Sequence, residues 1–143
     1  MKLRLAALLA CMALSAPLAA QQFDTISFGV DGGYPPFDVL APSGEITGFD
    51  IDIANALCTQ LKAKCVFVKQ PFESMIAALN AHKFDAIIAS LNMTDARKKE
   101  VDFTDRYYRS AAQLVARKGS PLLPEVASLK GKTVGVQTGS THE

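Results

Sequence analysis

The sequence predicts an α/β fold built on an open sheet that carries a ligand site at one edge. Short runs rich in β-branched and apolar residues alternate along the chain with runs whose apolar residues recur every three to four positions. In addition, residues 86–97 pass from an apolar strand directly into a polar loop and then into a helix start. In open α/β sheets this arrangement lies at the carboxyl ends of the strands, where small ligands bind.

The first half of the chain predicts two strands, a turn-rich segment and a helix. A strand is expected at 25–30, where β-branched residues alternate with others. Residues 31–37 form a rigid loop, because their glycines permit unusual backbone angles and their prolines block a helix. A turn at 42–45 separates two short extended pieces, and a helix at 48–62 leads into a strand at 65–68.

The second half predicts a further helix–strand–helix unit and then a less regular segment. An amphipathic helix is expected at 71–81, a buried strand at 86–89 and a short capped helix at 94–100. The remaining expected elements are extended segments at 103–104 and 112–116, a short helix after Pro124, a strand at 132–137, and a turn with a helix N-cap at 138–141.

Arg97 stands in the first turn of the expected helix at 94–100. A positive charge there opposes the helix dipole, so it lowers stability unless an anion lies nearby. That anion is either a bound ligand or one of two neighbouring carboxylates, Asp95 and Asp102, in a surface pair. The segment alone leaves both alternatives open.

Residues 1–20 predict an export signal, with cleavage after Ala20. Lys2 and Arg4 precede an apolar run that is too short to span a bilayer, and small residues follow it. The alternative is a lipoprotein cleavage box ending at Cys11, which would leave few apolar residues before the cut. We therefore expect the mature protein in the periplasm.

Composition then excludes several classes of partner. The whole chain has 15 Lys+Arg and 14 Asp+Glu, and removal of a signal with two basic residues leaves 13 against 14. A near-neutral chain lacks the basic surface of a nucleic-acid or membrane-surface binder. In an oxidising compartment Cys58 and Cys65 are expected to pair, since two cysteines without nearby histidines supply too few ligands for a metal. We expect no cofactor.

The chain stops at Glu143, just after the strand predicted at 132–137. That strand would lack a covering helix and neighbouring strands if nothing followed it. We therefore expect a fragment of a longer protein, with one lobe and the opening of another.

Several motifs occur in a fixed order along the chain and resemble one protein family. They are Asp31-x-x-Tyr34-x-Pro36-Phe37, Gly48-Phe49-Asp50-Ile51-Asp52, the Cys58/Cys65 pair, Asp85-Ala86-Ile87, Thr94-x-x-Arg97, Val101-x-Phe103-Thr104-x-x-Tyr107-Tyr108 and Leu129-Lys130-Gly131-Lys132 through Gly139-Ser140-Thr141. The chain from about Phe23 onward resembles the periplasmic polar and basic amino-acid-binding proteins of ABC transporters. It is most similar to the lysine/arginine/ornithine and histidine type of solute-binding protein family 3.

The resemblance implies a two-lobed, type II periplasmic binding protein fold. Residues 21–110 would form the N-terminal lobe, incomplete without a later return of the chain, and 111–143 would begin the second lobe. Such a protein captures a basic L-amino acid by hinge closure and delivers it to a membrane permease. The resemblance further implies a monomer that is not an enzyme.

The resemblance also assigns residues to the ligand's amino-acid end. Arg97 matches the arginine that grips the α-carboxylate, and Thr141 matches a donor to the same group. Ser140 lies beside Thr141 in the same turn, and His142 follows it in a position to line the cleft. Ser90 matches a contact to the α-amino group. Asn92 stands where the basic type usually carries serine, which leaves its role open.

Three more residues correspond to the side-chain end of the ligand. Asp31 matches the acid that pairs with a cationic side chain, and Tyr34 and Phe72 match aromatic walls around it. Without the resemblance, Asp31 would be a turn residue capping Gly33 or Tyr34, and Phe72 would be ordinary helix core. Asp50, with Asp52, is interpreted as a helix N-terminal acid.

Two other functions remain as alternatives. A periplasmic dehydratase on the same fold would need an acid or base over the reacting carbon, and no catalytic constellation is recognisable in the sequence. A ligand-binding module of a membrane receptor would carry a transmembrane helix downstream.

Overall fold

The computed structural model describes residues 23–143, and the predicted export signal with its lipoprotein alternative lies outside the described residues. Three parallel strands form the main sheet: β1 (Thr25–Val30), β5 (Lys64–Lys69) and β6 (Ala86–Ile87). Their order is β5-β1-β6, so β1 is the central strand. The α/β class predicted from the sequence is confirmed.

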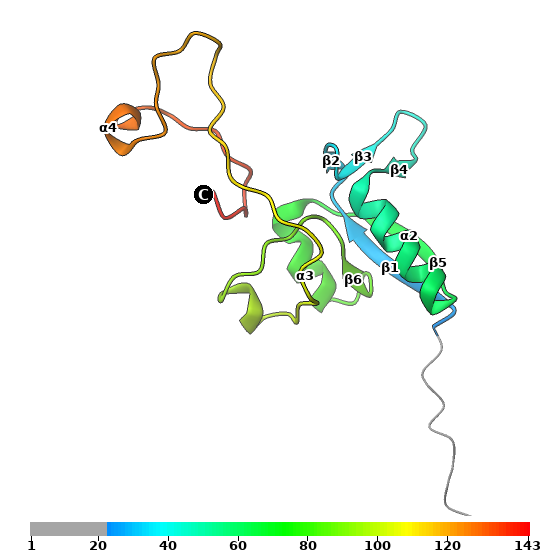
Figure 1. The fold of residues 1–143 in the computed structure, drawn as a ribbon. Coiled ribbons are helices and arrows are strands. Elements are labelled where there is room, and N and C mark those ends of the chain that lie inside the picture. The colour runs from blue at the N-terminus through cyan, green and yellow to red at the C-terminus, as the bar shows by residue number, and fades with distance from the viewer. Residues whose placement is uncertain (1–22) are drawn as a thin grey trace, which may run out of the picture.

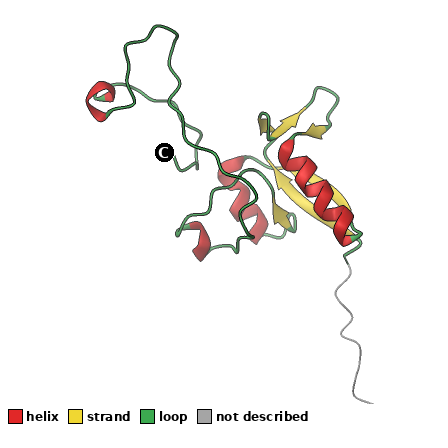
Figure 2. Cartoon of the chain, in the orientation of Figure 1, coloured by secondary structure: helices red, strands yellow, loops and turns green. Residues whose placement is uncertain are grey.

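Helices cover both faces of this sheet (Figures 1 and 2). Successive side chains of a strand point to opposite faces, so a central strand supplies two cores. On one face, β1 packs against α2 (Phe49–Leu61); the buried residues are Phe28, Val30, Ile51, Ala54, Cys58 and Ile88. On the other face, the core beneath α3 (Met75–Asn80) contains Met75, Ala78, Phe84 and Ala89.

Gly29 faces the α3 side of β1 and leaves room for an aromatic ring. A Cβ built on Gly29 would lie 2.5 Å from the Phe84 ring, well inside van der Waals contact. Phe84 is 3% exposed and closes the core beneath α3. The missing side chain of Gly29 is therefore a packing requirement.

A second, antiparallel sheet follows β1 and contains β2 (Gly33–Tyr34), β3 (Asp38–Leu40) and β4 (Ile46–Thr47). The turn between two short extended pieces is confirmed, although β2 falls inside the segment predicted as a loop. A buried carboxylate holds the loop together: Asp38 Oδ1 accepts N–H bonds from Gly32 and Tyr34 at 3.1 and 3.0 Å.

The predicted disulfide is present. Cys58 and Cys65 are bonded, with their Cα atoms 5.8 Å apart, and they join the last turn of α2 to β5. Between them the helix ends at Lys62, whose backbone is left-handed with φ 55°. The disulfide therefore fixes a tight helix-to-strand connection beside a core residue, because Cys58 is 3% exposed.

Three expected elements differ in the structure. The helix predicted at 71–81 starts as a 3₁₀ turn, η2 (Phe72–Ser74), and continues as α3. The helix predicted at 94–100 is a single 3₁₀ turn, η3 (Arg97–Lys99). The strand predicted at 132–137 is wrong: within residues 23–143 this segment pairs with no strand, so its apolar pattern has no sheet to join.

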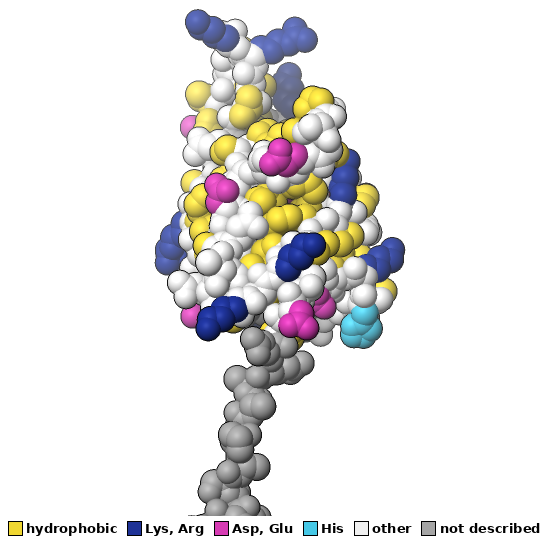
Figure 3. All heavy atoms as spheres, turned by 90° about the vertical axis from the view of Figure 1, so that its right-hand side faces the viewer, with side chains coloured by type: hydrophobic (Ala, Val, Ile, Leu, Met, Phe, Trp, Pro, Cys, Tyr) yellow, Lys and Arg dark blue, Asp and Glu magenta, His cyan; other side chains and the backbone are white. Residues whose placement is uncertain are grey.

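Beyond about residue 110 the chain extends away from the main sheet (Figure 1). It makes the short helix α4 (Val126–Leu129), as expected after Pro124, and returns with its C-terminal turn toward the region of α3. Helix α2 exposes Leu57 and Leu61, and Figure 3 shows hydrophobic side chains gathered amid charged ones on the face turned toward the viewer. No helix in the described part of the chain is long and apolar enough to cross a membrane.

Gly29→Ala is expected to lower the free energy of unfolding by about 1–3 kcal/mol, because overpacking displaces the buried Phe84 ring. Urea denaturation followed by circular dichroism measures the change. Gly135→Ala is the matched control, since a Cβ there meets no atom within 4 Å. Equal stability of the two variants would contradict the packing role of Gly29.

Removing the disulfide with the double variant Cys58→Ala/Cys65→Ala is expected to destabilise the protein by roughly 2–3 kcal/mol, because the unfolded chain gains loop entropy. The same denaturation experiment measures it. Adding a reductant should shift the wild-type midpoint and leave that of the double variant unchanged; a shift in both would show that the reductant acts elsewhere.

Candidate functional site

A pocket of roughly 180 Å³ lies at the carboxyl ends of β1 and β6. Its walls come from the loop after β1, the start of η2, the loop after β6 and the C-terminal turn. All nine residues predicted for the ligand site line it: Asp31, Tyr34, Phe72, Ser90, Asn92, Arg97, Ser140, Thr141 and His142. Ala89 and Gln137 complete the lining. Sequence reasoning did not assign Gln137 to the site.

Arg97 is fixed in this pocket by main-chain oxygens. One terminal nitrogen, Nη1, donates to the Asn92 carbonyl oxygen at 2.7 Å, and Nη2 donates to the Gly139 carbonyl oxygen at 2.8 Å. The guanidinium carbon also lies 5.7 Å from the centre of the Phe72 ring, within cation–π range. The loop that contains Asn92 and the C-terminal turn that contains Gly139 therefore both contact the Arg97 guanidinium.

The charge of Arg97 has no anionic partner among residues 23–143. The ion pair found there joins Lys98 to Asp95 at 3.8 Å, so the alternative in which Asp95 or Asp102 neutralises Arg97 is wrong. Partial burial lowers the pKa of the Arg97 guanidinium, because removal from water disfavours its charged form. An anion in the pocket would offset that cost.

The local fold around Arg97 is set by a cap. The Thr94 hydroxyl oxygen accepts the Arg97 backbone N–H at 3.2 Å, so the capped start that the sequence predicts is present. The turn continues through η3, whose other residues are exposed lysines. The cap thus orients the one side chain of η3 that enters the pocket.

The C-terminal turn closes the other side of the pocket. The Asn92 side-chain amide donates to the Thr141 hydroxyl at 3.3 Å, and the Gly139 N–H donates to the Glu143 carboxylate at 2.8 Å. A Cβ on Gly139 would lie 3.0 Å from the Glu73 Cα, so the turn packs directly on η2. Predicted first-lobe and second-lobe segments are therefore in contact here.

Asp31 and the aromatic residues Tyr34 and Phe72 reach the pocket from the loop after β1 and from the start of η2. Asp31 Oδ1 accepts the Phe72 backbone N–H at 3.2 Å, so it caps η2. The alternative in which Asp31 caps Gly33 or Tyr34 is wrong, since Tyr34 donates to Asp38. The Tyr34 ring stacks on Phe37 with centroids 5.2 Å apart and remains 42% exposed, which leaves it free to contact a ligand.

Asp50 is the residue of this region that the sequence interpretation missed. It is fully buried; its Oδ2 accepts the Ser90 hydroxyl at 2.8 Å and its Oδ1 accepts the Tyr107 hydroxyl at 3.1 Å. Burial raises the pKa of Asp50, while the two hydroxyl donors act against that rise. Helical spacing could have indicated this burial, because Asp50 shares a face with Ala54 and Cys58. Asp52 is exposed, as a first-turn acid is expected to be.

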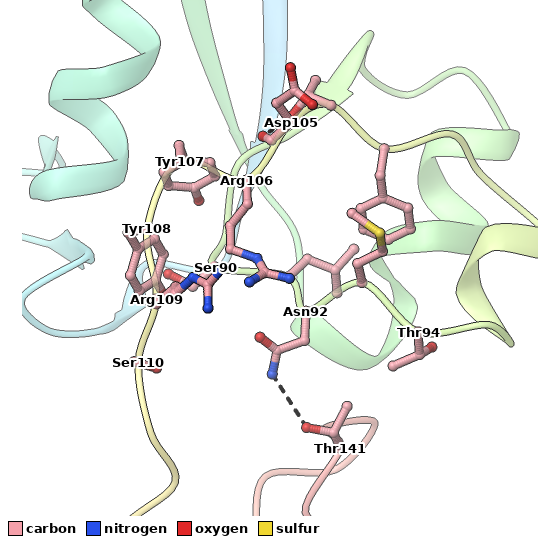
Figure 4. A pocket seen from close by; sticks show the side chains of 14 residues that line it. Ser90, Asn92, Thr94, Asp105, Arg106, Tyr107, Tyr108, Arg109, Ser110 and Thr141 are labelled. Carbon is pink, nitrogen blue, oxygen red and sulfur yellow. Dashed lines mark hydrogen bonds between the residues drawn. The ribbon is translucent and has the colours of Figure 1, made fainter.

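A second, larger cavity of roughly 520 Å³ adjoins the first (Figure 4). It lies between the loop after β6 and the chain segment 103–110, and it shares Ser90, Asn92 and Thr141 with the first pocket. Its charged lining residues are Asp105, Arg106 and Arg109, so cations outnumber anions there.

The chain matches one known protein family over nearly all of its described residues. The bacterial extracellular solute-binding proteins, family 3, match residues 26–141. The chain belongs to this family. The resemblance inferred from the sequence motifs is thereby confirmed.

Two curated relatives carry names that describe their ligands. The L-arginine-binding protein of Pseudomonas aeruginosa is 44% identical over 99% of this chain and 54% of that protein. The lysine/arginine/ornithine-binding periplasmic protein of Escherichia coli is 45% identical over 84% of this chain and 46% of that protein. The chain therefore spans about half the length of the curated relatives it matches.

A solved structure supports the same conclusion. An ancestral arginine-binding protein bound to arginine is 39% identical to this chain and superposes with a TM-score of 0.80 over 85% of it and 54% of the ancestral protein. The periplasmic binding protein fold that the sequence predicts is confirmed for the part this chain covers.

Proposed function

We propose that the protein is the substrate-binding component of an ABC transporter and captures a basic L-amino acid in the periplasm. The observation that carries the proposal is the pocket that Arg97, with no anionic partner in the described residues, lines together with Asp31, Tyr34 and Phe72. The arginine, lysine and ornithine relatives support this ligand class.

The cation of Arg97 would bind the ligand's α-carboxylate. A guanidinium has five N–H donors, and two of those of Arg97 are engaged by carbonyl oxygens. The remaining donors, together with the Thr141 hydroxyl, can serve an anion in the pocket. A charge-assisted bond of this kind contributes about 1.5–3 kcal/mol.

Asp31, Tyr34 and Phe72 would bind a cationic side chain. Asp31 supplies the carboxylate, and it is the one acidic residue in the described lining of the 180 Å³ pocket. Tyr34 and Phe72 supply aromatic faces, which attract a guanidinium or ammonium. A ligand that carries both a carboxylate and a cation suits a pocket lined by side chains of both charges.

Capture would proceed by closure of two lobes, residues 21–110 and a second lobe that begins at 111–143. The contacts of Arg97 with Gly139 and of Asn92 with Thr141 join these segments and support this mechanism. We further propose an exported, monomeric protein, processed near Ala20, that delivers its ligand to a membrane permease and binds no nucleic acid.

Binding rather than catalysis is the function we favour. The named relatives are binding proteins, and the groups in the pocket are suited to holding charges at both ends of an amino acid. No observation favours the dehydratase or the receptor module over this function.

The ligand class can be tested by NMR titration of the protein, which detects weak binding. L-arginine, L-lysine, L-ornithine and L-histidine are expected to shift the backbone amide signals of Ser90, Asn92 and Thr141, because these residues line the pocket. L-glutamine should bind more weakly, since it lacks the cation that Asp31 would pair with. Preference for L-glutamine over every cationic ligand would contradict the basic-ligand assignment.

Arg97→Lys is expected to weaken L-arginine binding by roughly ten- to a hundred-fold, because lysine keeps the charge and loses the bidentate donors. Calorimetry or the same titration measures the loss. Lys98→Ala is the matched control: it removes a neighbouring exposed cation that lies outside the pocket lining. Unchanged L-arginine affinity in Arg97→Lys would show that a positive charge alone suffices and would contradict the bidentate role of Arg97.

A further inference from the structure

A buried carboxylate stands directly behind one of the pocket's polar residues. We infer that Asp50 is a positioning residue that turns the Ser90 hydroxyl into an acceptor for the α-ammonium group of the ligand. The inference rests on the proposed function, and it gives Asp50 a role that its place in the first turn of α2 does not suggest.

The first step is the state of the Asp50 carboxyl group. Each of its two oxygens accepts a hydrogen bond from a different hydroxyl group, that of Ser90 at 2.8 Å and that of Tyr107 at 3.1 Å. The residue is fully buried. An ionised carboxylate accepts and cannot donate, so two donors on two oxygens satisfy it. The hydrogen bond from Tyr107 also fixes the orientation of the carboxylate, because it holds the oxygen that Ser90 does not contact.

The second step concerns the proton of Ser90. A hydroxyl carries one proton and two lone pairs, and here the proton points at Asp50. The Ser90 oxygen therefore offers only lone pairs to the pocket that it lines. The backbone φ of Ser90 is 52°, in the left-handed region that non-glycine residues rarely adopt because it is energetically unfavourable. The hydrogen bond to Asp50 therefore also helps to stabilise this backbone conformation.

The third step is the charge balance of the pocket. Arg97 is a cation at the carboxylate end, and an α-ammonium group would stand next to it on the same ligand carbon. An acceptor that cannot donate, backed by a buried negative charge, attracts an ammonium group and offers nothing to a second carboxylate. Asp50 thus makes the Ser90 side of the pocket favour the α-ammonium group over the α-carboxylate, although Asp50 itself does not line the cavity.

The test compares L-arginine with δ-guanidinovalerate, the same molecule without its α-amino group. In the wild type, the amino group should increase affinity, and Asp50→Asn should reduce that advantage about ten-fold by weakening L-arginine binding alone. The amide in this variant can donate to the Ser90 oxygen, and the Ser90 proton then faces the pocket. A purely structural role for Asp50 would instead weaken both ligands equally, and that result would overturn the inference.

Two further variants keep the test decisive. Asp52→Asn is the matched control, because Asp52 is the exposed acid of the same helical turn, and it should leave both affinities unchanged. Ser90→Ala should lose the same advantage, so if Asp50→Asn does not fold, an unaltered ligand preference in Ser90→Ala overturns the inference. Wild-type protein that fails to bind L-arginine at all would instead contradict the proposed function.

Discussion

The parallel pairing of β1 with β6 is the constraint on which the binding region depends. Phe28 aligns with Ala86 and Gly29 with Ile87, so both strands end at the same edge. Asp31 directly follows β1, and Ser90 stands three residues after the end of β6. Both therefore reach one pocket although they are 59 positions apart in sequence (90 − 31). The close approach of the Phe84 ring to Gly29 keeps this central pair packed against α3.

Electrostatics gives this edge its chemical character. The Arg97 guanidinium is held by two carbonyl oxygens, which orient it without neutralising it. The negative groups nearby are placed differently: Asp31 lines the pocket and also caps η2, whereas Asp50 is buried behind Ser90. Because the Asn92 carbonyl and the Thr94 cap already orient Arg97 within its own loop, that side chain would need little local reorganisation to bind an anion.

Local patterns sufficed for much of the fold, whereas the residues of the pocket were predicted through the family resemblance. Strand β1, helix α2 and the Cys58–Cys65 pair depend on nearby residues, and sequence periodicity together with cysteine count predicted them. The Asp50–Ser90–Tyr107 contacts were out of reach, since they join segments 40 and 57 positions apart. The prediction of a strand at 132–137 was wrong for a related reason. A strand needs a partner strand, and the periodicity of one segment does not show whether a partner is present.

The same long-range contacts tie the pocket wall to residues 107–108, near the end of the proposed first lobe. Tyr34 stacks on Phe37, Phe37 stacks on Tyr108 with centroids 4.9 Å apart, and Tyr107 donates to Asp50. A rotation of residues 107–108 would therefore disturb an aromatic wall and the carboxylate behind Ser90 together. If the proposed lobe closure turns about this segment, the pocket and the hinge share their packing, and a ligand that orders one necessarily biases the other.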